Sequence, residues 1–388
     1  MGCRAAGGRS RGRGKARTRS PRSRRVSGPA TTATRPVLVT GGAGFVGANL
    51  ADQLAAEGQT VLVYDALTRP GVEANLTWLT ERHGARIVPV IADIRDGAEL
   101  ALAVREAGAV FHFAAQVAVT TSMTAPWEDM EVNLGGTLTL LEALRARRSA
   151  VPLLFASTNK VYGGLPDVEL AVEGDAYRPT DSNLRAHGVG EDRRLDFHTP
   201  YGCSKGAADA YVLDYARSYG LPTVVMRMSC IYGPRQMGNE DQGWVAHFLI
   251  RALTNRTVTL YGDGRQVRDI LHVRDAVAAY RAALARIDRV AGRAFNLGGG
   301  PDNAVSLRGL IAHLGTLLGR EVGIETGAWR PGDQRYYVSD TRRAASMLGL
   351  EPPLPWREGV ADLAAGLTQW LDAEAATSRA ARQPEAVL

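Results

Sequence analysis

The sequence predicts an α/β protein with a doubly wound parallel sheet and a smaller C-terminal lobe. Up to Gly233, short apolar runs alternate with stretches of helical character. Continuous apolar strands separated by helices are typical of a parallel sheet that helices cover on both faces. Beyond Gly233 the alternation loosens, which indicates a lobe and then a return of the chain to the sheet. No repeat of fixed period is present, so a solenoid is excluded.

The expected elements follow from these runs. Strands are predicted at 36–40, 61–64, 87–90, 109–113, 153–157 and 223–228, and helices at 45–57, 98–106, 127–147 and 201–219. In the later part, strands are predicted at 258–261, 270–272 and 294–297, and helices at 244–254, 306–318 and 341–348. Ligands of open α/β sheets bind beyond the carboxyl ends of the strands, so we expect the chemistry there.

Positive charge is concentrated at the start of the chain. The 388 residues carry a formal net charge of +6, but the first 35 contain ten Arg, one Lys and no acidic residue, which leaves the rest at −5. We therefore expect residues 1–34 to be a disordered basic tail and 376–388 a flexible tail. The sheet-forming domain is expected at 35–233, with returning segments near 265–300, and the lobe mainly at 234–375.

Composition excludes several classes of protein. No aromatic residue lies among the N-terminal Arg, so nucleic-acid binding is not expected. No stretch approaches the roughly 20 apolar residues that cross a bilayer, and the start lacks the apolar segment of a secretory signal. Three cysteines without CxxC spacing favour a reducing, cytoplasmic location. The seven His show neither HxxxH nor HExxH spacing, so no metal site is expected.

A glycine-rich loop joins the first strand to the first helix. The run GGAGFVG has the spacing GxxGxxG. Gly41 permits a tight turn, Gly44 lets the backbone approach a pyrophosphate, and Gly47 lets helix and strand pack closely. The helix begins at Phe45 and Val46, where free N–H groups favour phosphate binding. Strand, loop, helix and second strand in this order predict the dinucleotide site of a Rossmann fold.

The end of the second strand predicts which dinucleotide binds. Asp65 lies 18 residues past the last glycine of the loop, where a carboxylate accepts hydrogen bonds from the adenosine ribose and repels a 2′-phosphate. This favours NAD over NADP, although Arg69 nearby is a group that pairs with 2′-phosphates. Asp93 and Ile94 follow the apolar run IVPVIA and are expected at the adenine edge, with a loop cap as the alternative for Asp93.

A YxxxK pair supplies the candidate catalytic groups. Tyr201 and Lys205 are four residues apart, so they share one face of the predicted helix. An ammonium near a phenol stabilises the phenolate, so we expect Lys205 to lower the pKa of Tyr201 and make it a general base. The strand that precedes this helix ends in the run Ser157 to Asn159, which places hydroxyls at a carboxyl end of the sheet.

These motifs together resemble the extended short-chain dehydrogenases/reductases. The resemblance rests on GGAGFVG, FHFAAQ at 111–116, the Ser-Thr pair at 157–158, YGCSK and IYGPRQ at 231–236, and it runs from about residue 36 to about residue 370. It implies an NAD-dependent enzyme whose domain at 35–233 binds the cofactor and whose lobe binds a nucleotide-linked sugar.

The same resemblance assigns roles to individual residues. It implies that Thr158 holds the reacting hydroxyl, Tyr201 moves its proton and Lys205 holds the nicotinamide ribose. It also implies that four further residues line the cofactor: Ala114, Ala115, Gln116 and Asn133. For Asn133, a structural amide inside its helix is the alternative.

A narrower resemblance points to a group of isomerases. STNKVYG at 157–163, the run 196–215, SCIYGPRQ, DQGWVAHF at 241–248 and the long insert between 164 and 197 resemble the CDP-paratose 2-epimerases, also called CDP-tyvelose epimerases. This implies inversion at C2 of a CDP-linked 3,6-dideoxyhexose through a transient keto intermediate. A nucleotide-sugar 4-epimerase is the main alternative.

Two further functions, a 4,6-dehydratase and a non-catalytic NAD-binding protein, are judged by the residues at the predicted site. The dehydratases of the family carry a Thr-Asp-Glu run at this strand end, whereas here Thr158 is followed by Asn159 and Lys160, which supply no acidic proton. A 4,6-dehydratase is therefore disfavoured. A non-catalytic NAD-binding protein would tolerate loss of Tyr201 or Lys205, and both are intact.

The resemblance also indicates which groups hold the nucleotide sugar. Arg268 in VRDILHV and Arg330 in RPGDQR match positions that bind the diphosphate and its ribose, and Arg235 in GPRQ is a third candidate, with a salt bridge as the alternative for each. Asp333 is expected to accept a ribose hydroxyl, while Trp244 is expected in the core of its helix. Sugar hydroxyls are expected to meet Gln116, Thr120, Ser122, Thr158 and Asn159.

A homodimer or homotetramer is expected, paired through the helices 127–147 and 201–219.

Overall fold

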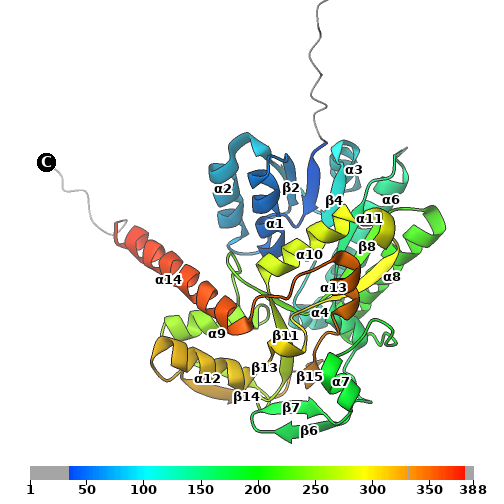
Figure 1. The fold of residues 1–388 in the computed structure, drawn as a ribbon. Coiled ribbons are helices and arrows are strands. Elements are labelled where there is room, and N and C mark those ends of the chain that lie inside the picture. Colours follow the sequence, from blue (N-terminus) through cyan, green and yellow to red (C-terminus); the bar gives the residue numbers. More distant parts are fainter. Residues whose placement is uncertain (1–34, 148, 331, 381–388) are drawn as a thin grey trace, which may run out of the picture. The chain divides into compact units, whose positions relative to one another are not determined.

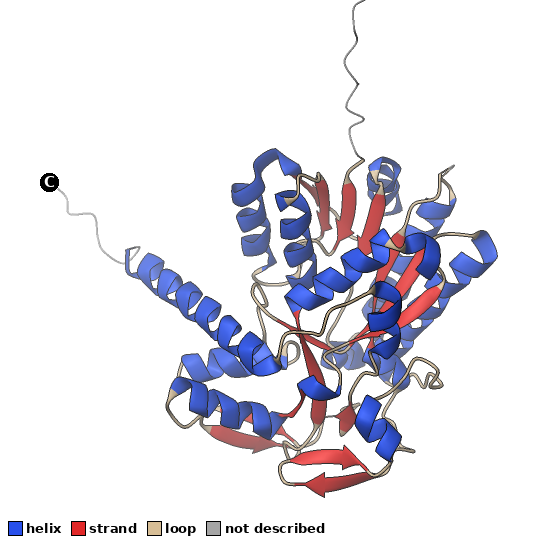
Figure 2. Ribbon diagram, viewed as in Figure 1, coloured by secondary structure: helices blue, strands red, loops and turns tan. Residues whose placement is uncertain are grey.

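A seven-stranded parallel sheet forms the centre of the chain from Arg35 onward (Figure 2). The computed structural model describes residues 35–147, 149–330 and 332–380. The strands lie in the order β12-β8-β5-β4-β1-β2-β3, and each neighbouring pair is parallel. They are β1 (Val37–Thr40), β2 (Val61–Asp65), β3 (Ile87–Ile91), β4 (Ala109–His112), β5 (Leu153–Thr158), β8 (Thr223–Met228) and β12 (Arg293–Leu297). The predicted doubly wound α/β fold, including the return of the chain to the sheet, is confirmed.

Helices cover both faces of this sheet (Figure 1). On one face lie α1 (Phe45–Ala56), α2 (Val72–His83), α10 (Val273–Ala285) and α13 (Arg342–Leu348). On the other lie α3 (Gly97–Glu106), α6 (Gly136–Arg145) and α8 (Thr199–Tyr219). Successive strand residues point to opposite faces, so a strand buried on both faces must be apolar throughout.

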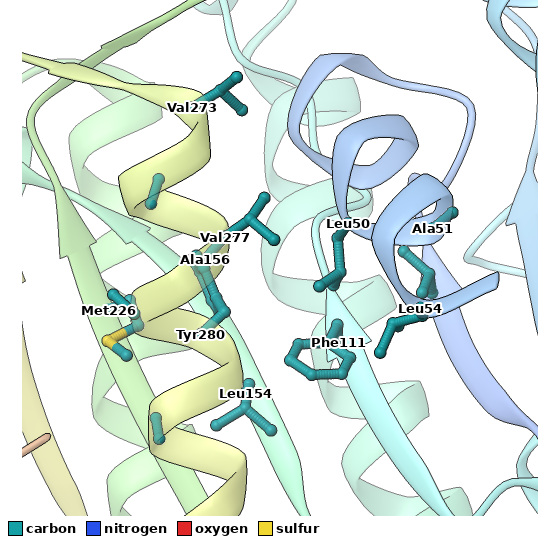
Figure 3. Close-up of a cluster of buried hydrophobic side chains, with 14 of the residues drawn as sticks. Leu50, Ala51, Leu54, Phe111, Leu154, Ala156, Met226, Val273, Val277 and Tyr280 are labelled. Carbon is teal, nitrogen blue, oxygen red and sulfur yellow. The ribbon is translucent and has the colours of Figure 1, made fainter. Parts of the chain in front are cut away.

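The hydrophobic cluster on the first face shows this packing directly (Figure 3). Phe111 of β4 and Leu154 of β5 lie between Leu50 of α1 and Tyr280 of α10. Phe155, the next residue of β5, belongs to the cluster on the opposite face. Each such buried side chain contributes roughly 1.5–3 kcal/mol. The carboxyl edge of the sheet is thereby held rigidly beneath the loops that carry the chemistry.

The lobe has its own hydrophobic cluster, between α9 (Trp244–Leu253), α12 (Leu307–Leu318) and α14 (Trp356–Ala380). Its strands are β9 (Cys230–Tyr232), β10 (Val258–Tyr261), β11 (Val267–His272), β13 (Ala304–Ser306), β14 (Ile324–Gly327) and β15 (Tyr336–Tyr337). Strand β11 pairs with β9, β13 and β15, and β10 pairs with β14. Among the described residues, no helix has the length and apolar character needed to span a bilayer.

The remaining elements are short and lie between the larger ones. They are η1 (Gly84–Arg86), α4 (Val119–Thr124), α5 (Pro126–Met130), η2 (Glu131–Gly135), η3 (Asn159–Tyr162), β6 (Leu170–Glu173), β7 (Ala176–Pro179), α7 (Ser182–His187), α11 (Ile287–Val290) and η4 (Pro301–Asn303). The hairpin β6–β7 and α7 occupy the insert between residues 164 and 197.

Three expectations about elements need correction. The helix expected at 127–147 is divided into α5, a π-helical turn at η2 and α6. Helices α2, α10 and α14 were not predicted at all, because Thr, Asn and Gly interrupt the apolar pattern of α2 and α14. Residues 376–380 belong to α14 and not to a flexible tail. The expected basic tail at 1–34 and residues 381–388 lie outside the described residues.

Candidate active site

A first cavity opens at the carboxyl edge of the sheet, where the strand order reverses between β1 and β4. It is bordered by the glycine loop and by the ends of β2, β4 and β5. The sequence-predicted residues that line it are Gly41, Gly44, Phe45, Val46, Gly47, Asp65, Asp93, Ile94, Ala114, Ala115, Tyr201 and Lys205. One wall of the cavity therefore contains most of the predicted cofactor site.

Close backbone contacts explain the glycines of the loop. Gly41 has a φ of +67°, and a Cβ there would lie 2.6 Å from the backbone nitrogen of Ala114. A Cβ on Gly47 would overlap the carbonyl oxygen of Gly41. The loop can therefore close against β4 and α1 only without these side chains.

The N-terminus of α1 faces this cavity and has no side-chain cap. Gly44 is the N-cap, with extended backbone and no side chain to accept from the first N–H groups of the helix. Those N–H groups and the positive end of the helix dipole suit a diphosphate. Together with the space left by the glycines, this arrangement fits the pyrophosphate of NAD.

Two carboxylates line the cavity beside the ends of β2 and β3. Asp65 at the end of β2 accepts hydrogen bonds from the backbone N–H of Ala43 and of Leu67, both at 3.0 Å. It thus ties the glycine loop to β2 while lining the cavity. Asp93 is bonded to the Arg95 guanidinium at 2.7 Å, and that contact lowers the pKa of Asp93.

Tyr201 and Lys205 lie on the first turns of α8, buried beside the first cavity. The Tyr201 backbone N–H donates to the Ser122 hydroxyl at 3.2 Å, which places the start of α8 against α4. The Lys205 ammonium lies 4.3 Å from the centroid of the Phe155 ring. The Thr158 hydroxyl, at the end of β5, hydrogen-bonds the Tyr201 phenol. The three predicted catalytic groups are therefore brought together.

The expected pKa of Tyr201 is wrong in direction. Burial raises the pKa of Tyr201 to about 12, and the Asp129 carboxylate adds to the increase, while the hydrogen bond to Thr158 opposes it. Burial also lowers the pKa of Lys205 to about 7, against the pull of Asp209 and Asp129. Desolvation is the largest cause of both shifts, and the attraction between ammonium and phenolate expected from the sequence is not among the causes.

A buried polar cluster lies behind the catalytic pair. Asp129 accepts hydrogen bonds from Ser204 at 2.5 Å, Gln116 at 2.8 Å and Asn133 at 3.1 Å. Gln116 and Asn133 therefore lie behind the cavity wall and not in it, which differs from their expected roles. Asn133 sits in the π-helical turn, and π turns often occur at functional sites.

A second cavity lies between this edge of the sheet and the lobe, and Gln242 borders both cavities. Arg268, on β11, donates to the Asp333 carboxylate at 2.7 Å. Arg330 donates to the Glu240 carbonyl oxygen at 2.8 Å, and its guanidinium lies 3.6 Å from the centroid of the Tyr261 ring. The sequence-predicted residues that line this cavity are Thr120, Arg268, Arg330 and Asp333.

Three other predicted substrate residues lie elsewhere. Arg235 lines the first cavity, with its guanidinium 3.9 Å from the centroid of the Trp78 ring. Ser122 is fully buried, where it donates to a backbone carbonyl of its own helix and supports α8. The Asn159 amide donates to Gln334 at 3.2 Å. The polar atoms of Ser122 and Asn159 already have protein partners, so these two side chains support the walls of the site.

Sequence reasoning missed several residues of the second cavity. Trp244, expected in a helix core, lines the cavity, and its indole N–H has no partner among the described residues. Lys160 and Gln266 also line it. These residues belong to no motif and show no regular spacing in the sequence. Only the charge of Lys160 distinguished one of them.

Known proteins resemble this chain over most of its length. The model of the "NAD dependent epimerase/dehydratase family" matches residues 37–298. A CDP-paratose 2-epimerase of Salmonella typhi is 40% identical over 331 residues, which covers 84% of this chain and 96% of that protein. A dTDP-glucose 4,6-dehydratase of Xanthomonas campestris is 34% identical and covers 84% of this chain and 90% of that protein.

Solved structures agree with these sequence relatives. The UDP-glucose 4-epimerase of Thermotoga maritima, solved with UDP-glucose, has a TM-score of 0.74 at 29% identity, covering 87% of this chain and 99% of that one. The UDP-glucose 4-epimerase of Thermus thermophilus, in complex with NAD, has a TM-score of 0.70 at 31% identity, covering 85% and 98%. The chain therefore belongs to the NAD-dependent epimerase/dehydratase family of enzymes, as its motifs predicted.

Proposed function

We propose that this enzyme inverts the configuration at C2 of a CDP-linked 3,6-dideoxyhexose through a transient keto sugar. One observation carries the proposal: the Tyr201 phenol borders a cavity suited to NAD, and that cavity adjoins a second one that contains Arg268 and Arg330. A nucleoside diphosphate needs such cations, because guanidinium groups match phosphate oxygens in pairs. The 40% identity to a CDP-paratose 2-epimerase supports cytosine as the nucleobase of the substrate and C2 as the carbon that is inverted.

The chain's own groups supply the acid–base chemistry. Tyr201 takes the proton of the sugar hydroxyl as a phenolate and later returns it. The hydrogen bond with Thr158 favours that phenolate, while burial opposes it, and Lys205 holds the nicotinamide ribose. NAD, when bound, would supply the hydride acceptor and donor for the sugar carbon. Inversion requires that the site leave the keto sugar room to present its opposite face.

Dehydration is disfavoured by the residues after Thr158. Elimination of a hydroxyl needs an acid and a base beside the oxidised carbon. Asn159 carries an amide that is bonded to Gln334, and Lys160 carries a positive charge. Neither group is a carboxyl, so the pair found in the family's dehydratases is missing at this strand end.

Product analysis tests the proposal. The purified enzyme is incubated with CDP-, UDP-, GDP- and dTDP-hexoses in ordinary and in deuterated water, and products are read by NMR. We expect inversion at C2 of a CDP-3,6-dideoxyhexose with no solvent deuterium at that carbon, since the hydride returns from the cofactor. Inversion at C4 of a UDP-sugar, loss of water, or deuterium at C2 would each overturn it. Tyr201→Phe, treated in parallel, shows that any product depends on this site.

A further inference from the structure

Lysine is rare in this chain, and its positions are informative. Only three of the 46 basic side chains are lysines: Lys15, Lys160 and Lys205. Lys205 belongs to the catalytic group described above. Lys160 lies in η3, two residues after Thr158, and lines the second cavity. A protein that otherwise uses Arg thus places an ammonium in each of its two adjoining cavities.

Lys160 differs from its cationic neighbours in having no anionic partner. Within residues 35–147, 149–330 and 332–380 it forms no ion pair, and its ammonium donates to the carbonyl oxygen of Gly332 at 3.2 Å. Arg268, in contrast, is paired with Asp333, and Arg330 lies near the Glu240 carboxylate at 3.5 Å. The second cavity is lined by three carboxylates, Glu240, Asp241 and Asp333, and by three cations, of which Lys160 is the one that forms no ion pair with a described residue.

An uncompensated cation in such a place is costly until an anion arrives. The pKa of Lys160 is lowered to about 8, mainly by burial and also by the nearby Arg268, while Asp333 and Cys230 act in the opposite direction. An anion beside the ammonium would reverse this shift, because it favours the charged form. The Lys160 ammonium is thus the group in this cavity that is suited to pair with a bound phosphate.

We propose that Lys160 binds the phosphate group that is bonded to the sugar, and that Arg268 and Arg330 hold the rest of the nucleotide. The inference rests on the proposed function only in assuming a nucleoside diphosphate sugar as substrate. The Lys160 backbone N–H donates to the Thr158 hydroxyl oxygen at 3.2 Å, so the backbone of Lys160 is fixed next to the catalytic group, while its ammonium extends to the Gly332 carbonyl oxygen.

This placement is consistent with reaction at C2. The phosphate is bonded through oxygen to C1, and C2 is the neighbouring ring carbon, whereas C4 lies across the ring. A phosphate held beside Thr158 brings the C2 hydroxyl near the Tyr201 phenol. If only the lobe arginines held the phosphate, the sugar ring could extend further toward the phenol, and C4 could reach it in place of C2.

A comparison of diphosphate and monophosphate binding tests the proposal. CDP carries the sugar-side phosphate and CMP lacks it, so we measure the Kd of both by calorimetry with the NAD-loaded enzyme. In Lys160→Met, CDP should bind roughly 10- to 100-fold more weakly, as expected for a lost charge-assisted hydrogen bond, while CMP binding is unchanged. Lys160→Arg should recover most of the CDP affinity, because it restores the charge.

Each contrary result is decisive. Unchanged CDP binding in Lys160→Met, an equal loss for CDP and CMP, or failure of Lys160→Arg to recover would overturn the role of Lys160. The NAD content of every variant serves as the folding control, since Lys160 does not line the first cavity. The same titrations with UDP and UMP separate the two proposals: preference for UDP removes the CDP assignment, while the difference between UDP and UMP still decides the role of Lys160.

Discussion

The two cavities that adjoin at Gln242 are built by different means. The first depends on backbone: a contiguous loop from Gly41 to Gly47 and the uncapped start of α1. The second depends on side chains from segments far apart in the sequence, such as Lys160, Arg268 and Arg330. A cavity wall made of closely packed backbone leaves no room for an added side chain. A wall made of charged side chains can lose one charge while the rest of the wall stays in place. Substitutions should therefore affect NAD and the nucleotide sugar separately.

The largest expected effect arises where the two cavities must cooperate. Tyr201→Phe removes the hydroxyl that moves the proton, so turnover should fall roughly 100-fold or more while NAD stays bound. Turnover is measured by NMR and bound NAD by absorbance. Tyr211→Phe, on the exposed side of the same helix, is the matched control and should be near wild type. Normal turnover in Tyr201→Phe would remove the phenol from the mechanism.

The backbone character of the first cavity is tested by adding one methyl group. In Gly47→Ala the new Cβ would overlap the Gly41 carbonyl oxygen, so the loop must shift and NAD affinity should fall by roughly 30-fold or more. NAD titration by fluorescence gives the value. Gly366→Ala in α14, where a Cβ meets no atom within 4 Å, should leave NAD affinity unchanged. Wild-type NAD binding in Gly47→Ala would contradict the loop's role.

The side-chain character of the second cavity is tested at Arg330. Arg330→Met should raise the KM for the sugar nucleotide about 10-fold through loss of a charge-assisted contact, with NAD affinity unchanged. Steady-state kinetics and NAD titration together give both values. Arg308→Met, an exposed lobe arginine that does not line the cavity, is the control. A parallel loss of NAD affinity would show that the cavities are coupled and not separable.

The smallest expected effect concerns stability and pH. Lys205 has a pKa of about 7 when folded, below that of an unfolded lysine, so the unfolded chain binds more protons between pH 7 and pH 10. The free energy of unfolding of the NAD-free enzyme should therefore rise with pH across that range. Lys205→Met should reduce this rise, to which the lowered pKa of Lys160 still contributes, and should stabilise the protein at pH 7 at the expense of activity. Denaturant unfolding at several pH values checks both; a flat wild-type profile would contradict the low pKa.

The sequence predicted the first cavity better than the second, because the first is built from local motifs and the second from residues far apart in the chain. The glycine loop, Asp65 and the YxxxK pair are local patterns, and the structure places all of them at the first cavity. Gln116 and Asn133 could not be separated from true lining residues, because their hydrogen bonds to Asp129 depend on how α5, η2 and α8 pack. Arg235 likewise appeared equivalent to Arg330, yet it stacks on Trp78 in the other cavity.

By itself, the sequence determined the alternation of strands and helices, the dinucleotide loop and the YxxxK pair on one helix, because each depends on neighbours within a few residues. Only the tertiary structure decided the protonation of Tyr201 and Lys205, since burial sets their pKa values. It also decided that Lys160 has no anionic partner within the part of the chain that the structure describes. Desolvation and charge pairing depend on what the whole fold brings alongside a residue, and no local pattern encodes that.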